Sequence, residues 1–398
     1  MTASGCAPGE TRQQEGADRA LTRRFAMETV FYPGRYYVPR PARVQQGGSV
    51  DPHPSTKPPK IVDVAKRAGV SLSTVSRVMN QNPTVDPVLA ARVRKAAKAL
   101  NYHASPLARS LVLGRTQTVS VVVPDLGNPT FQAILRGLSR AAKRQGYHVL
   151  IADSAEAVAE EGVLAVESRR RSDGLVLCAP RMEQSELDAL LPSLEPVVLV
   201  NRESSAGVPT VAADYRSALR ELGEHLYGLG HRRFVFLSGV PGSASNRNRL
   251  VAVDEFRRAH EDVDVQALEC GVGFEDGAVA VDAVLDSGAT AALAYNDLVA
   301  MGLLSAVTER GLRVPDDLSI VGFDDIPFTK YTNPPLTTSS VPAEDIGEQA
   351  WVEMSSLLAG NSARHPVYFR PRLVVRASTA PVQGAEKAAA PMVEHPLG

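Results

Sequence analysis

Residues 61–80 read IVDVAKRAGVSLSTVSRVMN, and the rest of the chain is organised around this stretch. Two short helical patterns meet there at a Gly-Val-Ser break, which is the layout of a helix-turn-helix. Gly69 ends the first helix, because glycine tolerates the positive φ found just after a helical C-terminus. Ser71 supplies a hydroxyl that can cap the free N–H groups of the second helix. The apolar positions predicted to pack the two helices together are Val64, Ala65, Ala68, Val75 and Val78.

The second helix keeps a short, polar and basic face on the side away from its apolar residues. This face comprises Leu72, Ser73, Thr74, Ser76 and Arg77. Hydroxyls and a guanidinium suit base edges and phosphates in the major groove of DNA. We therefore expect this helix to contact double-stranded DNA. The alternative is a small helical module that contacts another protein.

The charge is unevenly distributed, although the formal net charge of the 398 residues is only −1. From Lys57 to Arg115 the chain carries a net +9, so the remainder carries −10. A basic segment on an acidic body is typical of a protein that binds nucleic acid through one part only.

Cysteine usage and hydropathy point to the cytoplasm. Cys6, Cys178 and Cys270 are far apart and odd in number, so they form neither a disulfide framework nor a zinc-binding spacing. No apolar run approaches the roughly 18 residues of a membrane helix, and the N-terminus lacks the apolar core of a secretory signal. We expect a cytoplasmic protein without metal, cofactor or membrane partner.

Composition divides the chain into five segments. Residues 1–58 are predicted to be a disordered arm, with translation from Met27 as an alternative, and residues 381–398 a disordered tail. Residues 59–104 form the helix-turn-helix domain, whose third helix begins at Asp86-Pro87, a carboxylate cap followed by proline. Residues 105–116 hold a helical turn too short to be stable alone, so it needs a second copy or DNA to fold.

Residues 117–380 alternate apolar runs with helical patterns. Such runs predict parallel strands covered on both faces, in two doubly wound α/β domains with a ligand at the strand C-termini. The predicted strands are 119–124, 147–151, 174–178, 196–200, 234–237, 291–294 and 318–322.

From about Lys60 to Thr379 the chain resembles the lac-repressor (LacI/GalR) family of bacterial transcription regulators. The segments that carry the resemblance are 63–71, 73–78, 106–111, 121–125, 128–129, 230–233, 296–297, 311–316, 322–326 and 335–338. One departure is Lys60, which stands where the family has a threonine, so the first helix lacks its ordinary cap.

The resemblance implies a homodimer that binds a pseudo-palindromic operator. By position, Leu72, Ser73 and Arg77 match the family's base-reading residues, and Thr74, Ser76 and Asn80 match phosphate contacts. Leu111 matches a hinge-helix leucine that enters the minor groove at the operator centre. An ordinary core leucine is the alternative for Leu111.

The resemblance also implies a periplasmic-binding-protein-like core that takes a small effector in its interdomain cleft, which then changes operator affinity. The matching effector-binding positions are Thr130, Phe131, Arg249, Asn296 and Asp324. Such a set suits a hydroxylated or otherwise polar ligand, such as a sugar or a nucleoside. The alternatives are a surface or domain-bridging salt link for Arg249 and a helix cap for Asp324.

Two classes of function use such a core. A sugar-processing enzyme or a transport-type binding protein would need a catalytic constellation, a phosphate-cradling glycine loop or a signal peptide, and the sequence shows none of these. His231 is a turn residue by its context, because no second histidine or nucleophile accompanies it. We therefore expect a ligand-responsive, DNA-binding repressor and not an enzyme.

Overall fold

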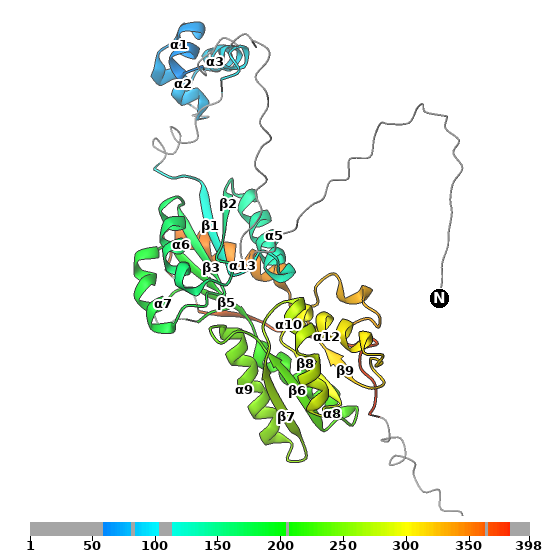
Figure 1. Ribbon diagram of the computed structural model, residues 1–398. Helices are drawn as coiled ribbons and strands as arrows, with labels where there is room; N and C mark the ends of the chain where they lie inside the picture. The colour runs from blue at the N-terminus through cyan, green and yellow to red at the C-terminus, as the bar shows by residue number, and fades with distance from the viewer. Residues whose placement is uncertain (1–58, 81–83, 103–113, 204–206, 363–364, 383–398) are drawn as a thin grey trace, which may run out of the picture. The chain divides into compact units, whose positions relative to one another are not determined.

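The computed structural model describes residues 59–80, 84–102, 114–203, 207–362 and 365–382. Residues 59–102 form a helical head, and residues 114–382 form a body of two α/β subdomains (Figure 1). The predicted disordered arm, most of the hinge segment with Leu111, and nearly all of the predicted tail lie outside the described residues.

The head consists of α1 (Ile61–Ala68), α2 (Leu72–Met79) and α3 (Pro87–Ala99). The Asp86 carboxylate accepts from the N–H groups of Val88 and Leu89 at 2.9 and 3.0 Å, so α3 begins where the sequence predicts. One small core holds the three helices together, and it includes all five predicted packing residues. Its buried members are Val64, Ala65, Ala68, Val75, Val78, Ala90, Val93, Ala96 and Ala97.

The first subdomain contains a six-stranded, fully parallel sheet in the order β11-β5-β4-β3-β1-β2. Its strands are β1 (Thr118–Val123), β2 (His148–Asp153), β3 (Gly174–Cys178), β4 (Val197–Val200), β5 (Thr210–Ala213) and β11 (Val367–Phe369). Four α-helices and a short 3-10 helix accompany the sheet: α5 (Pro129–Arg144), α6 (Val158–Arg170), α7 (Gln184–Leu190), η1 (Leu191–Leu194) and α13 (Ala343–Leu358).

Alternate residues of β1 enter different cores, as a two-sided parallel strand requires. Val121 packs in the cluster that contains α5 and α13, whereas Val122 packs with Ala165 of α6. Helices α5 and α13 cross very closely, because a Cβ at Gly137 would lie 2.0 Å from the Glu344 carbonyl oxygen. Glycine is therefore required at that crossing.

The second subdomain contains a four-stranded parallel sheet in the order β7-β6-β8-β9. Its strands are β6 (Arg233–Ser238), β7 (Asp264–Glu269), β8 (Ala291–Ala294) and β9 (Ser319–Val321). Its helices are α8 (Tyr215–Gly228), α9 (Ala244–Ala259), α10 (Phe274–Val279), α11 (Val281–Asp286), α12 (Asp297–Glu309) and the 3-10 helix η2 (Thr329–Tyr331). Phe236 packs with α8 and α9, and Val235 packs with α12.

The chain passes between the subdomains more than once, so both are built from distant segments. It leaves the first after β5 and returns to it at α13, through β10 (Thr338–Ser340). It then goes back from β11 to β12 (Arg372–Val374), which pairs with β10 in an antiparallel two-stranded ladder. The segment beyond β12 lies against the second subdomain, where the Ile320 N–H donates to the Ser378 carbonyl oxygen at 2.9 Å.

All seven predicted strands exist: 174–178 and 291–294 have the predicted ends, and the other five differ by one or two residues at an end. The sequence patterns missed β5, β7, β10, β11 and β12, of which three have only three residues. The expectation that every strand is covered on both faces is wrong for β2. It is an edge strand that pairs only with β1, and its Leu150 and Ile151 are 43% and 50% exposed.

Candidate nucleic-acid interface and ligand cleft

The turn before α2 fixes the direction of that helix. Gly69 has φ = 63°, in the left-handed region that favours glycine, and the Val70 N–H donates back to the Ala65 carbonyl oxygen at 3.2 Å. The Ser71 hydroxyl accepts from the Thr74 N–H at 3.1 Å and so caps α2. Both sequence predictions for this turn are confirmed. Lys60 supplies no side-chain cap to α1, but its N–H donates to Asp63 Oδ2 at 2.8 Å.

The outward face of α2 carries the predicted DNA-reading side chains. Leu72 is 48% exposed, and Ser73 and Arg77 are exposed as well, whereas Val75 and Val78 are buried in the head core. The other predicted contacts, Thr74, Ser76 and Asn80, are half-buried at the border of this face. The helix therefore has an accessible centre formed by Leu72, Ser73 and Arg77.

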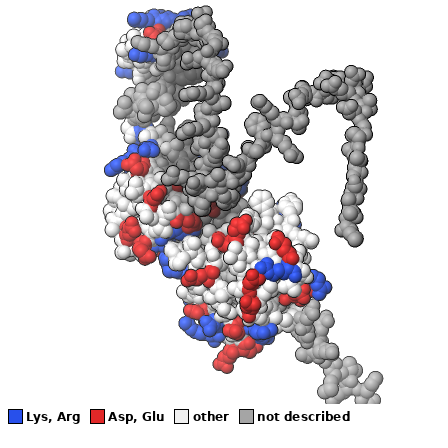
Figure 2. Space-filling model, viewed as in Figure 1, with Lys and Arg blue, Asp and Glu red and all other residues white. Residues whose placement is uncertain are grey.

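The charge of the head is strongly positive. Its described residues include eight Lys or Arg and only two acidic residues, Asp63 and Asp86. Figure 2 shows Lys and Arg, in blue, as the main charged groups on the described surface of the head. Within the described residues Arg77 has no ion pair, so its guanidinium is available to a phosphate or a base.

All five predicted effector-binding residues line one cavity of the body, between the two subdomains. Thr130 and Phe131 lie in the first turn of α5, which the Asn128 side chain caps through the Thr130 N–H at 2.9 Å. Arg249 comes from α9, Asn296 precedes α12, and Asp324 follows β9. Side chains nearly 200 residues apart thus meet at the strand C-termini, as expected for parallel α/β sheets.

Arg249 lies at the centre of this cavity, in a cage of aromatic rings. Its Cζ is 4.4 Å from the ring centroid of Tyr215, 4.5 Å from that of Tyr295 and 4.1 Å from that of Phe323. The side chain is 2% exposed, and its Nε and Nη1 have no hydrogen-bond partner in the described structure. Because Arg249 is buried and has no ion pair within 4.0 Å among the described residues, the alternative of a surface or domain-bridging salt link is not supported.

Asp324 lies near this guanidinium in a strained backbone conformation, with φ = 107°. The Thr130 hydroxyl donates to its Oδ2 at 2.9 Å, across the two subdomains. Burial raises the pKa of Asp324 to about 6, although Arg249 and the hydrogen bond from Thr130 act in the opposite direction. No helix begins directly after Asp324, because the next element is η2, so the helix-cap alternative is not supported.

A second buried carboxylate holds the turn that carries Asp324. Asp297 accepts from the Ile326 N–H at 2.8 Å and from the Thr338 hydroxyl at 2.6 Å. Burial is the main reason that the pKa of Asp297 is well above its ordinary value. Gly322 is required beside it, because a Cβ there would lie 2.1 Å from Asp297 Oδ1. Asp297 therefore acts as a positioning residue for Asp324.

Asn296 is largely occupied by contacts within the protein. Its Oδ1 accepts from the Val299 N–H at 2.9 Å and caps α12, and its Nδ2 donates to the Val272 carbonyl oxygen at 2.8 Å. One N–H of the amide is left for a ligand. His231 is likewise a structural residue, since its ring nitrogens contact Thr290 Oγ1 at 2.9 Å and the Ala380 carbonyl oxygen at 3.0 Å.

The sequence patterns missed several polar residues of the same cavity. The buried Arg181 and the half-buried Glu156 form an ion pair at 2.8 Å on its wall. Asn201 follows β4 directly, and Tyr295 follows β8 directly. The rule that ligands bind beyond the C-termini of parallel strands would have found these two, had it been applied to every strand.

The free volume of this cavity is about 30 Å³, which is small for a ligand site. Ser245, Tyr295 and Ser243 close part of it through mutual hydroxyl contacts of 2.9 to 3.0 Å. A sugar-sized ligand needs more volume than this, so its binding requires a rearrangement of the groups around the cavity.

Other kinds of site are not found in the described part of the chain. No cluster of three or more histidine, cysteine or acidic side chains there could hold a metal ion. None of the described helices is long and apolar enough to cross a membrane.

A helix-turn-helix head joined to a two-subdomain body with a ligand cleft defines a class of regulatory DNA-binding protein. Residues 60–105 match the model of "Bacterial regulatory proteins, lacI family", and residues 224–379 match a "Periplasmic binding protein-like domain".

Relatives in sequence and structure agree with these matches. The chain is 33% identical over 327 residues to the HTH-type transcriptional repressor CytR of Escherichia coli, covering 80% of this chain and 95% of the relative. It is 32% identical over 291 residues to catabolite control protein A of Staphylococcus xylosus, covering 72% and 88%. The crystal structure of the lac repressor dimer bound to operator and the anti-inducer ONPF has a TM-score of 0.75 and 26% identity, and the match covers 81% of this chain and all of that one.

The chain belongs to the lacI family of bacterial regulatory proteins. This confirms the predicted family and the predicted fold, a helix-turn-helix head with a periplasmic-binding-protein-like α/β core. Like these relatives, it is a transcription regulator and not an enzyme.

Proposed function

We propose that this protein is a repressor that binds a pseudo-palindromic operator as a homodimer. In this proposal a small polar effector in the cleft lowers or raises the affinity for the operator. In this proposal Leu72, Ser73 and Arg77 read bases, and Thr74, Ser76 and Asn80 contact phosphates. Leu111 enters the minor groove between the two half-sites. The exposed face of α2 and the excess of basic residues in the head support the DNA-binding part.

The effector site comprises Thr130, Phe131, Arg249, Asn296 and Asp324. The observation that carries this assignment is the caged Arg249 guanidinium, which is buried, lacks partners at Nε and Nη1, and lies near the Asp324 carboxylate. Buried donors without acceptors are costly, so a ligand oxygen that accepts from them binds favourably. Hydroxyls of the ligand could in turn donate to Asp324. A neutral polyhydroxylated ligand, such as a sugar or a nucleoside, fits both groups.

Solved relatives support a dimer and a carbohydrate effector without fixing either for this chain. One is a lac repressor dimer on its operator, and a regulator from Enterococcus faecium at 25% identity was solved with bound ribose. The exposed edge strand β2, with Leu150 and Ile151, offers this chain an apolar surface for pairing. We also infer that the protein acts in the cytoplasm, where chromosomal DNA is accessible.

Selection of bound sequences from a random double-stranded DNA pool tests the proposal directly. We expect recovery of one palindrome-like motif, bound with nanomolar-range affinity that falls steeply as salt rises. A panel of sugars and nucleosides, ribose and cellobiose among them, is then screened for release or tightening of that motif. Recovery of no specific sequence would overturn the repressor assignment.

A further inference from the structure

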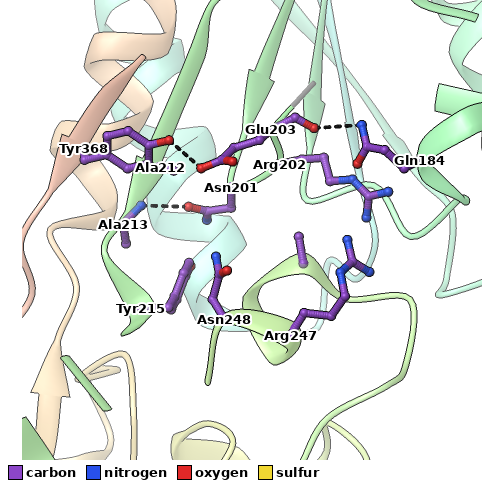
Figure 3. Close-up of a pocket in the computed structure, with 11 residues that line it drawn as sticks. Gln184, Asn201, Arg202, Glu203, Ala212, Ala213, Tyr215, Arg247, Asn248 and Tyr368 are labelled. Atoms are coloured by element: carbon purple, nitrogen blue, oxygen red, sulfur yellow. Dashed lines mark hydrogen bonds between the residues drawn. The ribbon is translucent and has the colours of Figure 1, made fainter. Parts of the chain in front are cut away.

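A second cavity adjoins the cleft at the place where the chain crosses between the subdomains. Its volume is about 170 Å³, and Asn201 and Tyr215 line both this cavity and the cleft. Ala213, at the end of β5, and Tyr368 of β11 line its first-subdomain side, and Arg247 of α9 lines the opposite side. We call this cavity the crossover pocket (Figure 3).

Two guanidinium groups from different subdomains converge in the crossover pocket. Arg202 follows β4 and is 2% exposed, whereas Arg247 is exposed on the first turns of α9. Both donate to the same Gly242 carbonyl oxygen, at 3.2 Å from Arg202 Nη1 and 3.3 Å from Arg247 Nη1. Figure 3 shows the two groups pointing toward each other.

In the part of the chain that the structure describes, no carboxylate lies within ion-pair distance of either guanidinium. Within the described residues Arg202 and Arg247 form no ion pair, and Arg202 otherwise donates to the carbonyl oxygens of Pro180 (3.4 Å) and Met182 (2.8 Å). The Nε of Arg202 has no hydrogen-bond partner among the described residues. Burial is the main reason that the pKa of Arg202 is lowered, and the positive charge of Arg247 acts in the same direction, whereas Glu161, Glu183 and Asp188 act in the opposite direction.

The one carboxylate that lines the crossover pocket is already engaged. Glu203 accepts a short hydrogen bond from the Tyr368 hydroxyl, and its backbone carbonyl accepts from Gln184 Nε2 at 3.1 Å. Glu161, Glu183 and Asp188, whose negative charges act on Arg202, do not line the pocket, and the groups beside the two guanidiniums there include the neutral amides of Gln184 and Asn248. Planar guanidinium forks match the oxygens of a phosphate group closely.

We propose that the crossover pocket binds a small phosphate monoester, with its phosphate between Arg202 and Arg247. An anion there removes the repulsion between two cations that belong to different subdomains. It therefore stabilises the arrangement in which these subdomains lie close together, and so affects the neighbouring cleft. This site is separate from the proposed effector site, because Arg249 and Asp324 do not line it.

Isothermal titration of the full-length protein with glycerol 3-phosphate tests the proposal, with glycerol as the neutral control. We expect the wild type to bind the phosphate ester and not glycerol. Arg247→Ala weakens this binding at least tenfold, and Arg247→Lys, which keeps the charge, weakens it less. Arg258→Ala, an exposed arginine further along the same helix α9, leaves the affinity unchanged.

Three results would overturn the proposal: no binding by the wild type at millimolar concentrations, unchanged binding by Arg247→Ala, or equal binding of glycerol. Arg249→Met identifies the cleft as the true site if it abolishes binding that Arg247→Ala retains. None of these measurements uses DNA or the cleft effector. Their failure therefore leaves the proposed repressor function untouched.

Discussion

The head and the cleft differ in how their proposed binding residues are arranged. The proposed DNA-reading face lies on one exposed helix of eight residues, α2, and its side chains project from neighbouring positions. The cleft gathers buried side chains from α5, α9 and the segments that follow β8 and β9. An exposed face can be altered without disturbing the fold, whereas the cleft residues are coupled to one another and to the packing of both subdomains.

Among substitutions that affect one of the two sites and not the other, we expect the largest effect from replacing Arg249. Replacing it with Met keeps side-chain bulk among Tyr215, Tyr295 and Phe323 but removes the donors, so we expect effector affinity to fall at least about 100-fold. Operator affinity should change less than about twofold, because the proposed DNA-reading face on α2 does not include Arg249. Thermal-shift and DNA-release assays with the active sugar or nucleoside measure this, with Arg258→Ala as control. An unchanged response would show that the cleft assignment is wrong.

A second test of the coupled cleft uses pH. The pKa of Asp324 is about 6 in the folded body, against about 3.9 in an unfolded chain. Between these values the folded state holds a proton that the unfolded state has released. The carboxylate therefore lowers the free energy of unfolding as pH rises from 4 to 6, by about 3 kcal/mol in full.

Asp324→Asn removes this dependence, so the variant should gain stability relative to the wild type as pH rises through that window. Urea unfolding followed at several pH values measures the difference. Asp264→Asn, at an exposed carboxylate of β7, serves as the control and should show no such change. If the free energy of unfolding had the same pH dependence in wild type and Asp324→Asn, the raised pKa of the buried Asp324 would be contradicted.

The exposed face is tested at Arg77. Its truncation in Arg77→Ala removes a contact worth about 1–3 kcal/mol, so operator affinity should fall about 5- to 150-fold and specificity at one base pair should relax. Because Arg77 is exposed, the stability of the head should not change. Fluorescence anisotropy with the selected DNA and its point variants checks both. Arg94→Ala on α3 is the matched control, expected to weaken all sequences equally if it has any effect.

The smallest effect concerns the start of α1. Lys60→Thr supplies the side-chain cap that Lys60 lacks and should stabilise the helix by about 0.5–1 kcal/mol. Amide hydrogen exchange of α1 in the full-length protein should slow correspondingly. Asp63→Ala, which removes the acceptor of the Lys60 N–H, should speed it. Equal exchange in all three proteins would mean that the head core alone sets the stability of α1.

The head was predictable because its determinants are local. The Gly69 turn, the Ser71 cap and the spacing of Val64, Val75 and Val78 act over a few residues, and the structure confirms them. The two α/β subdomains with parallel sheets were also predictable, because apolar runs that alternate with helices are compatible with few other fold classes. Short strands such as β10 and β12 were not, because three residues carry no reliable periodicity.

By itself the sequence determined the family, the helix-turn-helix and, through resemblance, five residues that line one cavity. Only the tertiary structure showed the aromatic cage around Arg249, the hydrogen bond from Thr130 to Asp324, and the meeting of Arg202 with Arg247 at Gly242. Each joins segments that are far apart in the chain or in different subdomains. Such contacts depend on how the two subdomains pack and on where the chain crosses between them. The spacing of residues within a short segment determines neither.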